Sequence, residues 1–358
     1  MVKYKNYLLS INQILIILLI IFGFLYFSMF AGCSNSVSDS AADSSSPLYI
    51  SKSGFLLNTE VTINIYDKQE DTILEECFQL IQKYENICSR TAKNSELYKI
   101  NNRTAPQDGD LFHISKELSE VLRNGLHYSK ITKGAFDISV EPLTSLWNFT
   151  SLEPSVPAPT AIKAALSSVN YEFIHLDKNN IRFDKTDVRL DLGAIAKGYI
   201  ADKVKEYLLS AGVKSALINL GGNVLCVGKK PDGSAFHVGI QKPFADRNEL
   251  VGMMEINDLS IVSSGIYERF FTVDKVLYHH ILNPKTGYPY DNDLISVTIL
   301  SKKSVDGDGL STSCFALGLE NGLKLIESLQ NTYAVFITSD YELHYSKGFQ
   351  EAINFTKQ

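Results

Sequence analysis

The sequence predicts an α+β fold in which mixed, mostly antiparallel sheets pack against helices. Apolar residues recur at helical spacing over 72–87, and a second helix is predicted over 115–132. Short strand-like runs follow one another between 216 and 273, which is typical of an antiparallel sheet. With 45% hydrophobic residues in a chain of 358, the sequence can bury a large core.

The expected elements follow in chain order. They are a strand at 55–66, helices at 72–87, 95–101 and 115–132, a loop leading to Pro142 and Trp147, a helix at 160–168, strands near 174 and in the run 181–190, a helix ending near 210, strands at 216–220, 224–227, 237–240, 251–256, 260–263, 270–273 and 294–300, a helix from 308, and a hairpin of 333–338 with 343–345.

The N-terminal region has the pattern of a targeting segment. Basic residues lie at positions 3 and 5, the run 14–27 is almost wholly apolar, and small residues lead into Cys33. Residues 1–33 therefore resemble a bacterial lipoprotein signal peptide whose cysteine is lipid-modified, although an uncleaved membrane anchor is the alternative. Either one places the rest of the chain outside the cytoplasmic membrane. The Ser-rich stretch 34–47 is expected to be a flexible tether before a folded region that starts at 48.

Charge and cysteine usage exclude two classes of protein. The net charge is -6 and there is no basic tract, which argues against a nucleic-acid partner. Cys77, Cys88, Cys226 and Cys314 show no metal-ligand spacing. We expect them to be buried free thiols rather than a disulfide framework.

The stretch 191–202 carries the strongest functional signal. It follows a strand-like run and opens a helix, with glycines and alanines that allow a ligand to approach the backbone. Lys197 near the free N–H groups of a helix start would suit a phosphate, and Asp191 could accept a hydrogen bond from a base or ribose. The alternative is a strand, a tight turn and a packed helix with a surface lysine.

Four further segments have similar character, at 134–137, 219–223, 278–287 and 306–312, and together with 263–269 they occur in a fixed order with this one. The six segments are 134–137 (Gly-Ala-Phe-Asp), 191–198 (Asp-Leu-Gly-Ala-Ile-Ala-Lys-Gly), 219–223 (Asn-Leu-Gly-Gly-Asn), 263–269 (Ser-Ser-Gly-Ile-Tyr-Glu-Arg), 280–287 (His-Ile-Leu-Asn-Pro-Lys-Thr-Gly) and 308–312 (Asp-Gly-Leu-Ser-Thr). In this order they resemble the FAD:protein FMN transferases, the ApbE-like flavin transferases. The resemblance covers 48–358 as one flavin transferase domain and implies an ApbE-like, T-fold-related architecture.

The resemblance implies a Mg²⁺-dependent cleavage of FAD. FMN would pass to a Thr or Ser hydroxyl of an exported target protein as a phosphoester, and AMP would leave. Asp308 and Thr312 lie one helical turn apart and can offer a carboxylate and a hydroxyl to one Mg²⁺ ion. By similarity, the carbonyl of Ala194 completes the protein ligands of the metal.

The remaining site residues also follow from the resemblance. Lys197 would contact the phosphates of FAD, and the other FAD-contacting positions are Ala135, Phe136, Asp137, Asp191 and the backbone of Leu282. His280 is the candidate general base, with His279 as the competing choice because neighbours on a strand face opposite sides. Structural alternatives are that Asp308 caps a helix and that Asp137 shapes a turn.

Two positions depart from the family pattern, and two other activities stay open. Ser53-Gly54-Phe55 stands where relatives often have a Met-Gly-Thr-like segment, and Thr91 stands where many have an aromatic residue. An FAD pyrophosphatase that releases free FMN and AMP would use the same metal site. A flavin-binding lipoprotein without catalysis would need only the binding residues. We expect a lipid-anchored protein on the extracytoplasmic face of the cell membrane.

Overall fold

The computed structural model describes residues 49–246 and 248–358. The predicted signal peptide at 1–33 and tether at 34–47 lie outside the described residues. Within the described ranges, no helix is both long enough and apolar enough to cross a membrane.

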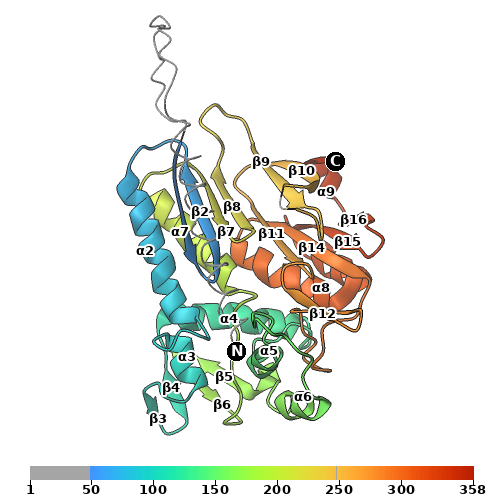
Figure 1. The fold of residues 1–358 in the computed structure, drawn as a ribbon. Helices are drawn as coiled ribbons and strands as arrows, with labels where there is room; N and C mark the ends of the chain where they lie inside the picture. Colours follow the sequence, from blue (N-terminus) through green and yellow to red (C-terminus); the bar gives the residue numbers. More distant parts are fainter. Residues whose placement is uncertain (1–48, 247) are drawn as a thin grey trace, which may run out of the picture. The chain divides into compact units, whose positions relative to one another are not determined.

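An eight-stranded sheet forms the centre of the fold (Figure 1). Its order is β1-β2-β7-β8-β11-β14-β15-β16, and every neighbouring pair is antiparallel. The strands are β1 (Ile50–Leu56), β2 (Thr59–Ile65), β7 (Ser215–Leu220), β8 (Asn223–Gly228), β11 (Ser260–Gly265), β14 (Leu294–Ser301), β15 (Tyr333–Thr338) and β16 (Leu343–Tyr345). The predicted α+β class with mostly antiparallel strands is confirmed.

Both faces of this sheet are covered. Helices α2 (Asp71–Cys88), α7 (Ala196–Ser210) and α8 (Ser304–Glu327) lie on one face (Figure 1). A three-stranded sheet of β9 (Phe236–Gln241), β10 (Leu250–Ile256) and β17 (Asn354–Lys357) lies on the other. Because side chains alternate along a strand, Phe336 of β15 packs into the helix-side core while Val335 and Ile337 pack against the small sheet.

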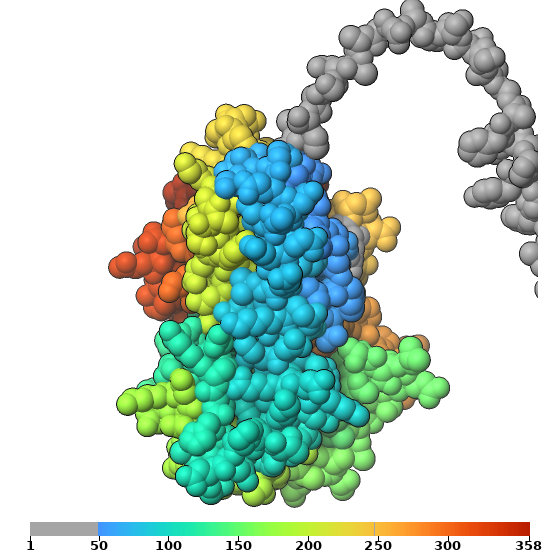
Figure 2. Space-filling view, turned by 90° about the vertical axis from the view of Figure 1, so that its left-hand side faces the viewer, coloured from blue at the N-terminus to red at the C-terminus, as the bar shows by residue number. Residues whose placement is uncertain are grey.

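A second group of elements lies below the ends of α2 and α7, as Figure 2 shows on the face that carries α2. It contains α3 (Glu96–Asn101), α4 (Lys116–Ile131), α5 (Glu141–Trp147), α6 (Pro159–Leu166), the 3-10 turn η1 (Tyr171–Phe173) and a sheet of β3 (Gln107–Asp108), β4 (Leu111–His113), β6 (Asn180–Phe183) and β5 (Ile174–Asp177). The hairpin of β12 (Phe270–Val273) and β13 (Val276–His279) and the short helix α9 (Phe349–Ala352) complete the fold.

Five sequence-based predictions of elements or boundaries were wrong. The strand expected at 55–66 is a hairpin, because Leu57 and Asn58 both take positive φ and turn the chain between β1 and β2. The run 181–190 is a strand only to Phe183, after which Arg189 forms a single parallel bridge to Val140.

The region before Trp147 is the helix α5 and not a loop, with proline in its first turn, where the missing N–H costs nothing. Helix α8 begins at Ser304, four residues before the expected start at 308, and β17 follows the hairpin that was expected to end the chain. The four cysteines of the described part are buried and free, as predicted.

Candidate active site

The first turn of α7 is bound by an aspartate from another helix. Oδ2 of Asp308 in α8 accepts a hydrogen bond from the backbone N–H of Gly198 at 2.9 Å, and the N–H of Lys197 also donates to this carboxylate. Asp308 is only 4% exposed and lies inside α8, so it caps α7 rather than the start of its own helix. The alternative in which Asp308 caps the start of its own helix is therefore wrong, because α8 begins at Ser304 and Asp308 instead accepts from the first turn of α7.

Because of this contact, the carbonyl of Ala194 lacks the N–H donor that a helix would provide. In a longer helix, the Gly198 N–H would bond to this carbonyl, but Asp308 takes that donor. Among the described residues, the Ala194 carbonyl accepts no hydrogen bond. The carbonyl of Ala194 and the carboxylate of Asp308 thus face the same turn of α7.

Close packing between α7 and α8 requires glycine at 198. A Cβ atom there would lie 2.3 Å from the carbonyl oxygen of Ser304 and 2.7 Å from Cβ of Asp308. The helices are also joined in the opposite direction, because Asp202 of α7 accepts hydrogen bonds from the N–H groups of Ser304 and Val305 at 2.7 and 2.9 Å. These contacts fix Asp308 relative to the start of α7.

Lys197 supplies positive charge at this place. Burial raises the pKa of Asp308, and the nearby ammonium of Lys197 opposes that rise. Lys197 is half-buried, and no carboxylate of the described residues forms an ion pair with it. A cation without a partner beside the N-terminus of a 15-residue helix is suited to an anionic phosphate.

The oxygen atoms around Asp308 match the ligand preference of Mg²⁺. Thr312 follows one turn later, is partly exposed, and its hydroxyl lies 3.1 Å from that of Ser264 in β11. With the carbonyl of Ala194, the candidate donors are a carboxylate, a hydroxyl and a carbonyl, which are all hard oxygen ligands. No cluster of three or more His, Cys, Asp or Glu side chains able to hold a metal occurs in the described part of the chain. A metal here would therefore depend on this small oxygen set and on ligand phosphates.

The two histidines have different surroundings. His279 is 5% exposed; its Nδ1 accepts from the Ile281 N–H, so its Nε2–H donates to the Tyr290 carbonyl at 2.9 Å. His280 is partly exposed, and its Nδ1–H donates to the Arg269 carbonyl at 3.2 Å, which leaves the lone pair on Nε2. Of the two, His280 has the free nitrogen that a general base needs.

The pKa values of both histidines are lowered, mainly by desolvation. For His280 the positive charges of Arg269 and Lys197 lower the pKa further, because a nearby positive charge disfavours the imidazolium form. His280 is therefore neutral at neutral pH. A phosphate anion bound beside it would raise its pKa, because negative charge favours the imidazolium form.

Tyr290 connects the histidines to the segment 134–137. Its hydroxyl donates to the carbonyl of Ala135 at 2.9 Å, and its own carbonyl accepts from His279. Phe136 is buried against the ring of Tyr128. No pattern in the sequence points to Tyr290, because its role depends on contacts between distant segments.

The carboxylate of Asp137 accepts its hydrogen bonds from the neighbouring Ser139 and from Tyr171. Its Oδ1 accepts from the N–H and hydroxyl of Ser139 at 2.8 and 2.7 Å, and Oδ2 accepts from the N–H of Tyr171 at 2.8 Å. The turn-shaping alternative for this side chain is thus present in the structure. Burial raises its pKa, while these three donors act in the opposite direction.

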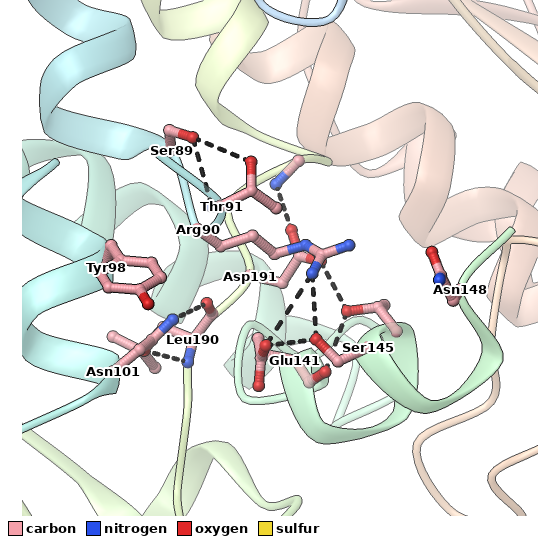
Figure 3. A network of polar contacts seen from close by, with 12 residues as sticks. Ser89, Arg90, Thr91, Tyr98, Asn101, Glu141, Ser145, Asn148, Leu190 and Asp191 are labelled. Carbon is pink, nitrogen blue, oxygen red and sulfur yellow. Dashed lines mark hydrogen bonds and ion pairs between the residues drawn. The ribbon is translucent and has the colours of Figure 1, made fainter. Parts of the chain in front are cut away.

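Asp191 lies in a polar network that joins three elements (Figure 3). Its Oδ2 is 3.0 Å from Nε of Arg90 and accepts from the hydroxyl of Thr144 in α5 at 2.8 Å. Its Oδ1 accepts from the Gly193 N–H at 2.8 Å. The Asp191 N–H also donates to the Ile138 carbonyl, which joins the segments around 137 and 191.

Two predicted segments have clear structural roles. Gly221 and Gly222, with φ of 62° and 89°, form the tight turn between β7 and β8, and a Cβ at Gly221 would overlap Thr59. Leu282 is 7% exposed and pairs with Pro289 in an isolated antiparallel bridge. Its backbone therefore lies in the turn that begins directly after His280.

Comparisons with known proteins agree with this arrangement. A sequence profile of the ApbE family matches residues 57–337. The chain is 35% identical to an FAD:protein FMN transferase of Klebsiella pneumoniae (strain 342) over 295 residues, 82% of this chain and 90% of the relative. It is 31% identical to one of Treponema pallidum (strain Nichols), covering 85% of this chain and 88% of that one.

Solved structures of ApbE proteins also resemble this chain. The flavin transferase ApbE from Vibrio cholerae superimposes with a TM-score of 0.75 and 28% identity, covering 85% of this chain and 98% of that one. The ApbE protein from Thermotoga maritima gives 0.77 and 28%, with the same shares of each chain. The resemblance inferred from the six segments and the ApbE-like architecture are both confirmed. The chain belongs to the ApbE family.

Proposed function

We propose that this protein is a Mg²⁺-dependent flavin transferase that moves FMN from FAD to a Thr or Ser hydroxyl of an exported protein and releases AMP. The observation that carries the proposal is the contact of the Asp308 carboxylate with the first turn of α7, beside the ammonium of Lys197, which pairs with no carboxylate of the described residues. The names of its relatives in the ApbE family support the same reaction.

Binding of the pyrophosphate and proton transfer would fall to different residues of the chain. Lys197 and the N-terminus of α7 bind and orient the pyrophosphate. His280 accepts the proton of the acceptor hydroxyl at Nε2, while the bond from Nδ1 to the Arg269 carbonyl holds the ring in the required tautomer. The hydroxyl oxygen forms a bond to the phosphorus of the FMN half, and the bond from that phosphorus to the bridging oxygen breaks, so AMP leaves with this oxygen.

Asp308, Thr312 and the Ala194 carbonyl would hold Mg²⁺. The ion would supply charge stabilisation for the pyrophosphate oxygens. Since these residues offer a single carboxylate, we expect the remaining ligands to be water and phosphate oxygens.

The N-terminal sequence supports a location for the reaction. We propose that Cys33 carries the lipid anchor and that the active site works on the extracytoplasmic face, where its acceptors are exported flavoproteins. Recovery of the mature protein from the soluble cytosolic fraction would contradict this location.

The experiment incubates the purified protein in detergent with FAD, Mg²⁺ and several exported domains that contain candidate Thr or Ser acceptors. Acceptor mass and free nucleotides are measured together. A gain of one FMN phosphoryl unit with equimolar AMP supports the transferase. Free FMN and AMP with unmodified acceptors would indicate a pyrophosphatase, and intact FAD would leave only binding.

A further inference from the structure

Ser264 of β11 joins two hydroxyl groups of α8, the helix that packs against this strand (Figure 1). Its Oγ lies 2.8 Å from Oγ of Ser311 and 3.1 Å from Oγ1 of Thr312. Ser311 is fully buried, whereas Ser264 and Thr312 are partly exposed. The three hydroxyls therefore form a continuous chain that begins at the accessible Thr312 and leads into the core.

The far end of this chain fixes the direction in which its protons point. The Ser311 hydroxyl lies 3.0 Å from the backbone carbonyl of Asp308 and donates to it, because a carbonyl oxygen can only accept. A hydroxyl has a single proton, so Ser311 must accept from Ser264. The proton of Ser264 is then used as well, and Ser264 accepts from Thr312.

This direction determines what Thr312 can offer to a ligand. Its proton points toward Ser264, and within 49–246 and 248–358 no donor bonds to its oxygen. The oxygen therefore keeps both lone pairs. A cation attracts these lone pairs and repels the hydroxyl proton, so Thr312 is oriented as a cation ligand one turn from the Asp308 carboxylate.

We propose that Ser264 is a positioning residue of the metal site, which accepts the Thr312 proton and so presents the Thr312 oxygen to a divalent cation. The inference rests on the proposed function, because it takes Asp308 and Thr312 as ligands of Mg²⁺. The hydroxyl chain ends on the backbone of Asp308, so it also links the two side-chain ligands to each other. Ser264 itself acts through Thr312 and does not contact the ion.

The test measures the affinity of the full-length protein for Mn²⁺, which prefers the same oxygen ligands as Mg²⁺. Free Mn²⁺ is followed by electron paramagnetic resonance with saturating FAD and no acceptor, and FAD without protein gives the background. In Ser264→Ala, which removes one hydrogen bond, Mn²⁺ affinity is expected to fall about 3-fold to 10-fold. Ser264→Thr keeps the hydroxyl and suits a strand, so it should restore the wild-type affinity.

Ser263→Ala is the matched control. Ser263 is the adjacent residue of the same strand, faces the opposite side of the sheet, and bonds to the Thr298 hydroxyl at 2.8 Å. This variant also removes one bond between two hydroxyls, but it lies outside the chain that ends at Thr312. It is expected to keep the wild-type affinity for Mn²⁺.

A double-mutant cycle distinguishes positioning from a general structural role. Thr312→Val conserves the shape of the side chain and removes the proposed ligand. If Ser264 acts through Thr312, adding Ser264→Ala to Thr312→Val causes no further loss of Mn²⁺ affinity. Ser264→Cys keeps the volume with a much weaker hydrogen-bonding group, so it gives the same measurement should the alanine variant fail to fold.

Two results would overturn the inference while the proposed function stands. One is wild-type Mn²⁺ affinity in both Ser264→Ala and Ser264→Cys, and the other is additive losses in the double variant. Failure of the wild-type protein to bind Mn²⁺ with FAD would instead reject the metal site of the proposed function, and this inference with it.

Discussion

Asp202 and Asp308 cap each other's helices. Asp308 of α8 accepts from the Gly198 N–H in the first turn of α7, and Asp202 of α7 accepts from the Ser304 and Val305 N–H groups in the first turn of α8. Each carboxylate thus caps the helix that carries the other one. They differ in their surroundings, since Asp308 lies beside Lys197 and one turn from Thr312.

Substitution of Gly198 by alanine is expected to separate α7 from α8. The added Cβ would lie 2.3 Å from a backbone oxygen, which cannot rotate away as a side chain can. We expect a loss of about 1–3 kcal/mol in the free energy of unfolding, measured by urea denaturation. Gly233→Ala is the control, because nothing lies within 4 Å of its Cβ and only backbone strain applies. An equal loss in both variants would argue against close packing at Gly198.

Arg90→Lys tests whether Arg90 positions Asp191 for the ligand. Lysine keeps the charge but cannot serve Asp191 and Ser145 together through a planar fork. KM for FAD is expected to rise about 10-fold while kcat changes much less. The control is Arg182→Lys, since Arg182 pairs with Asp184 on the exposed surface. If KM stayed at the wild-type value, the contact between Arg90 and Asp191 would serve the fold alone.

His279 is expected to make the protein less stable in mild acid. Desolvation lowers its pKa from 6.5 to about 4 in the folded state, although the Tyr290 carbonyl and the charge of Asp291 oppose the shift. Above pH 6.5 both folded and unfolded forms are neutral at this residue. As pH falls from about 6.5 to 4, only the unfolded state takes up the proton, so the free energy of unfolding falls by on the order of 3 kcal/mol.

The measurement is urea denaturation between pH 4 and 7. In His279→Gln the side chain still has a donor and an acceptor, so the slope between pH 6.5 and 4 should become shallower, and His280, whose pKa is also lowered, accounts for part of the slope that remains. His237→Gln removes an exposed histidine and should leave the slope unchanged. A wild-type slope in His279→Gln would show that other groups cause the acid dependence.

Local patterns predicted much of the fold. The apolar spacing at 72–87 predicted α2, observed at Asp71–Cys88, because its buried residues lie on one face. The hairpin turn at Leu57 and Asn58 was missed because it lacks the glycine that usually marks such a turn. Helix α8 starts earlier than expected because its first N–H groups bond to Asp202, a partner distant in sequence.

The site was predicted less completely than the fold, because several of its residues act through partners that are distant in sequence. The order of the segments identified the family and drew attention to Lys197 and Asp308, which the structure brings together. Arg90 and Tyr290 were not selected, since each acts through tertiary contacts with residues far along the chain. The turn that Asp137 makes with Ser139 was among the alternatives read from the sequence, whereas its bond from the distant Tyr171 N–H was not predictable from a local pattern.

The most direct test of the account compares Asp308→Asn with Asp202→Asn in the transfer reaction. Each variant keeps one side-chain oxygen for capping, and Asp202→Asn gives up one of its two accepted N–H bonds. A larger loss of transfer in Asp308→Asn therefore reports on the charge beside Lys197 rather than on helix capping. We measure FMN gain on the acceptor and AMP release with Mg²⁺, and again after EDTA. We expect a loss of transfer of about 100-fold or more in Asp308→Asn, near-normal transfer in Asp202→Asn, and no transfer with EDTA. Equal activity of the two variants, or transfer that persists in EDTA, would contradict it.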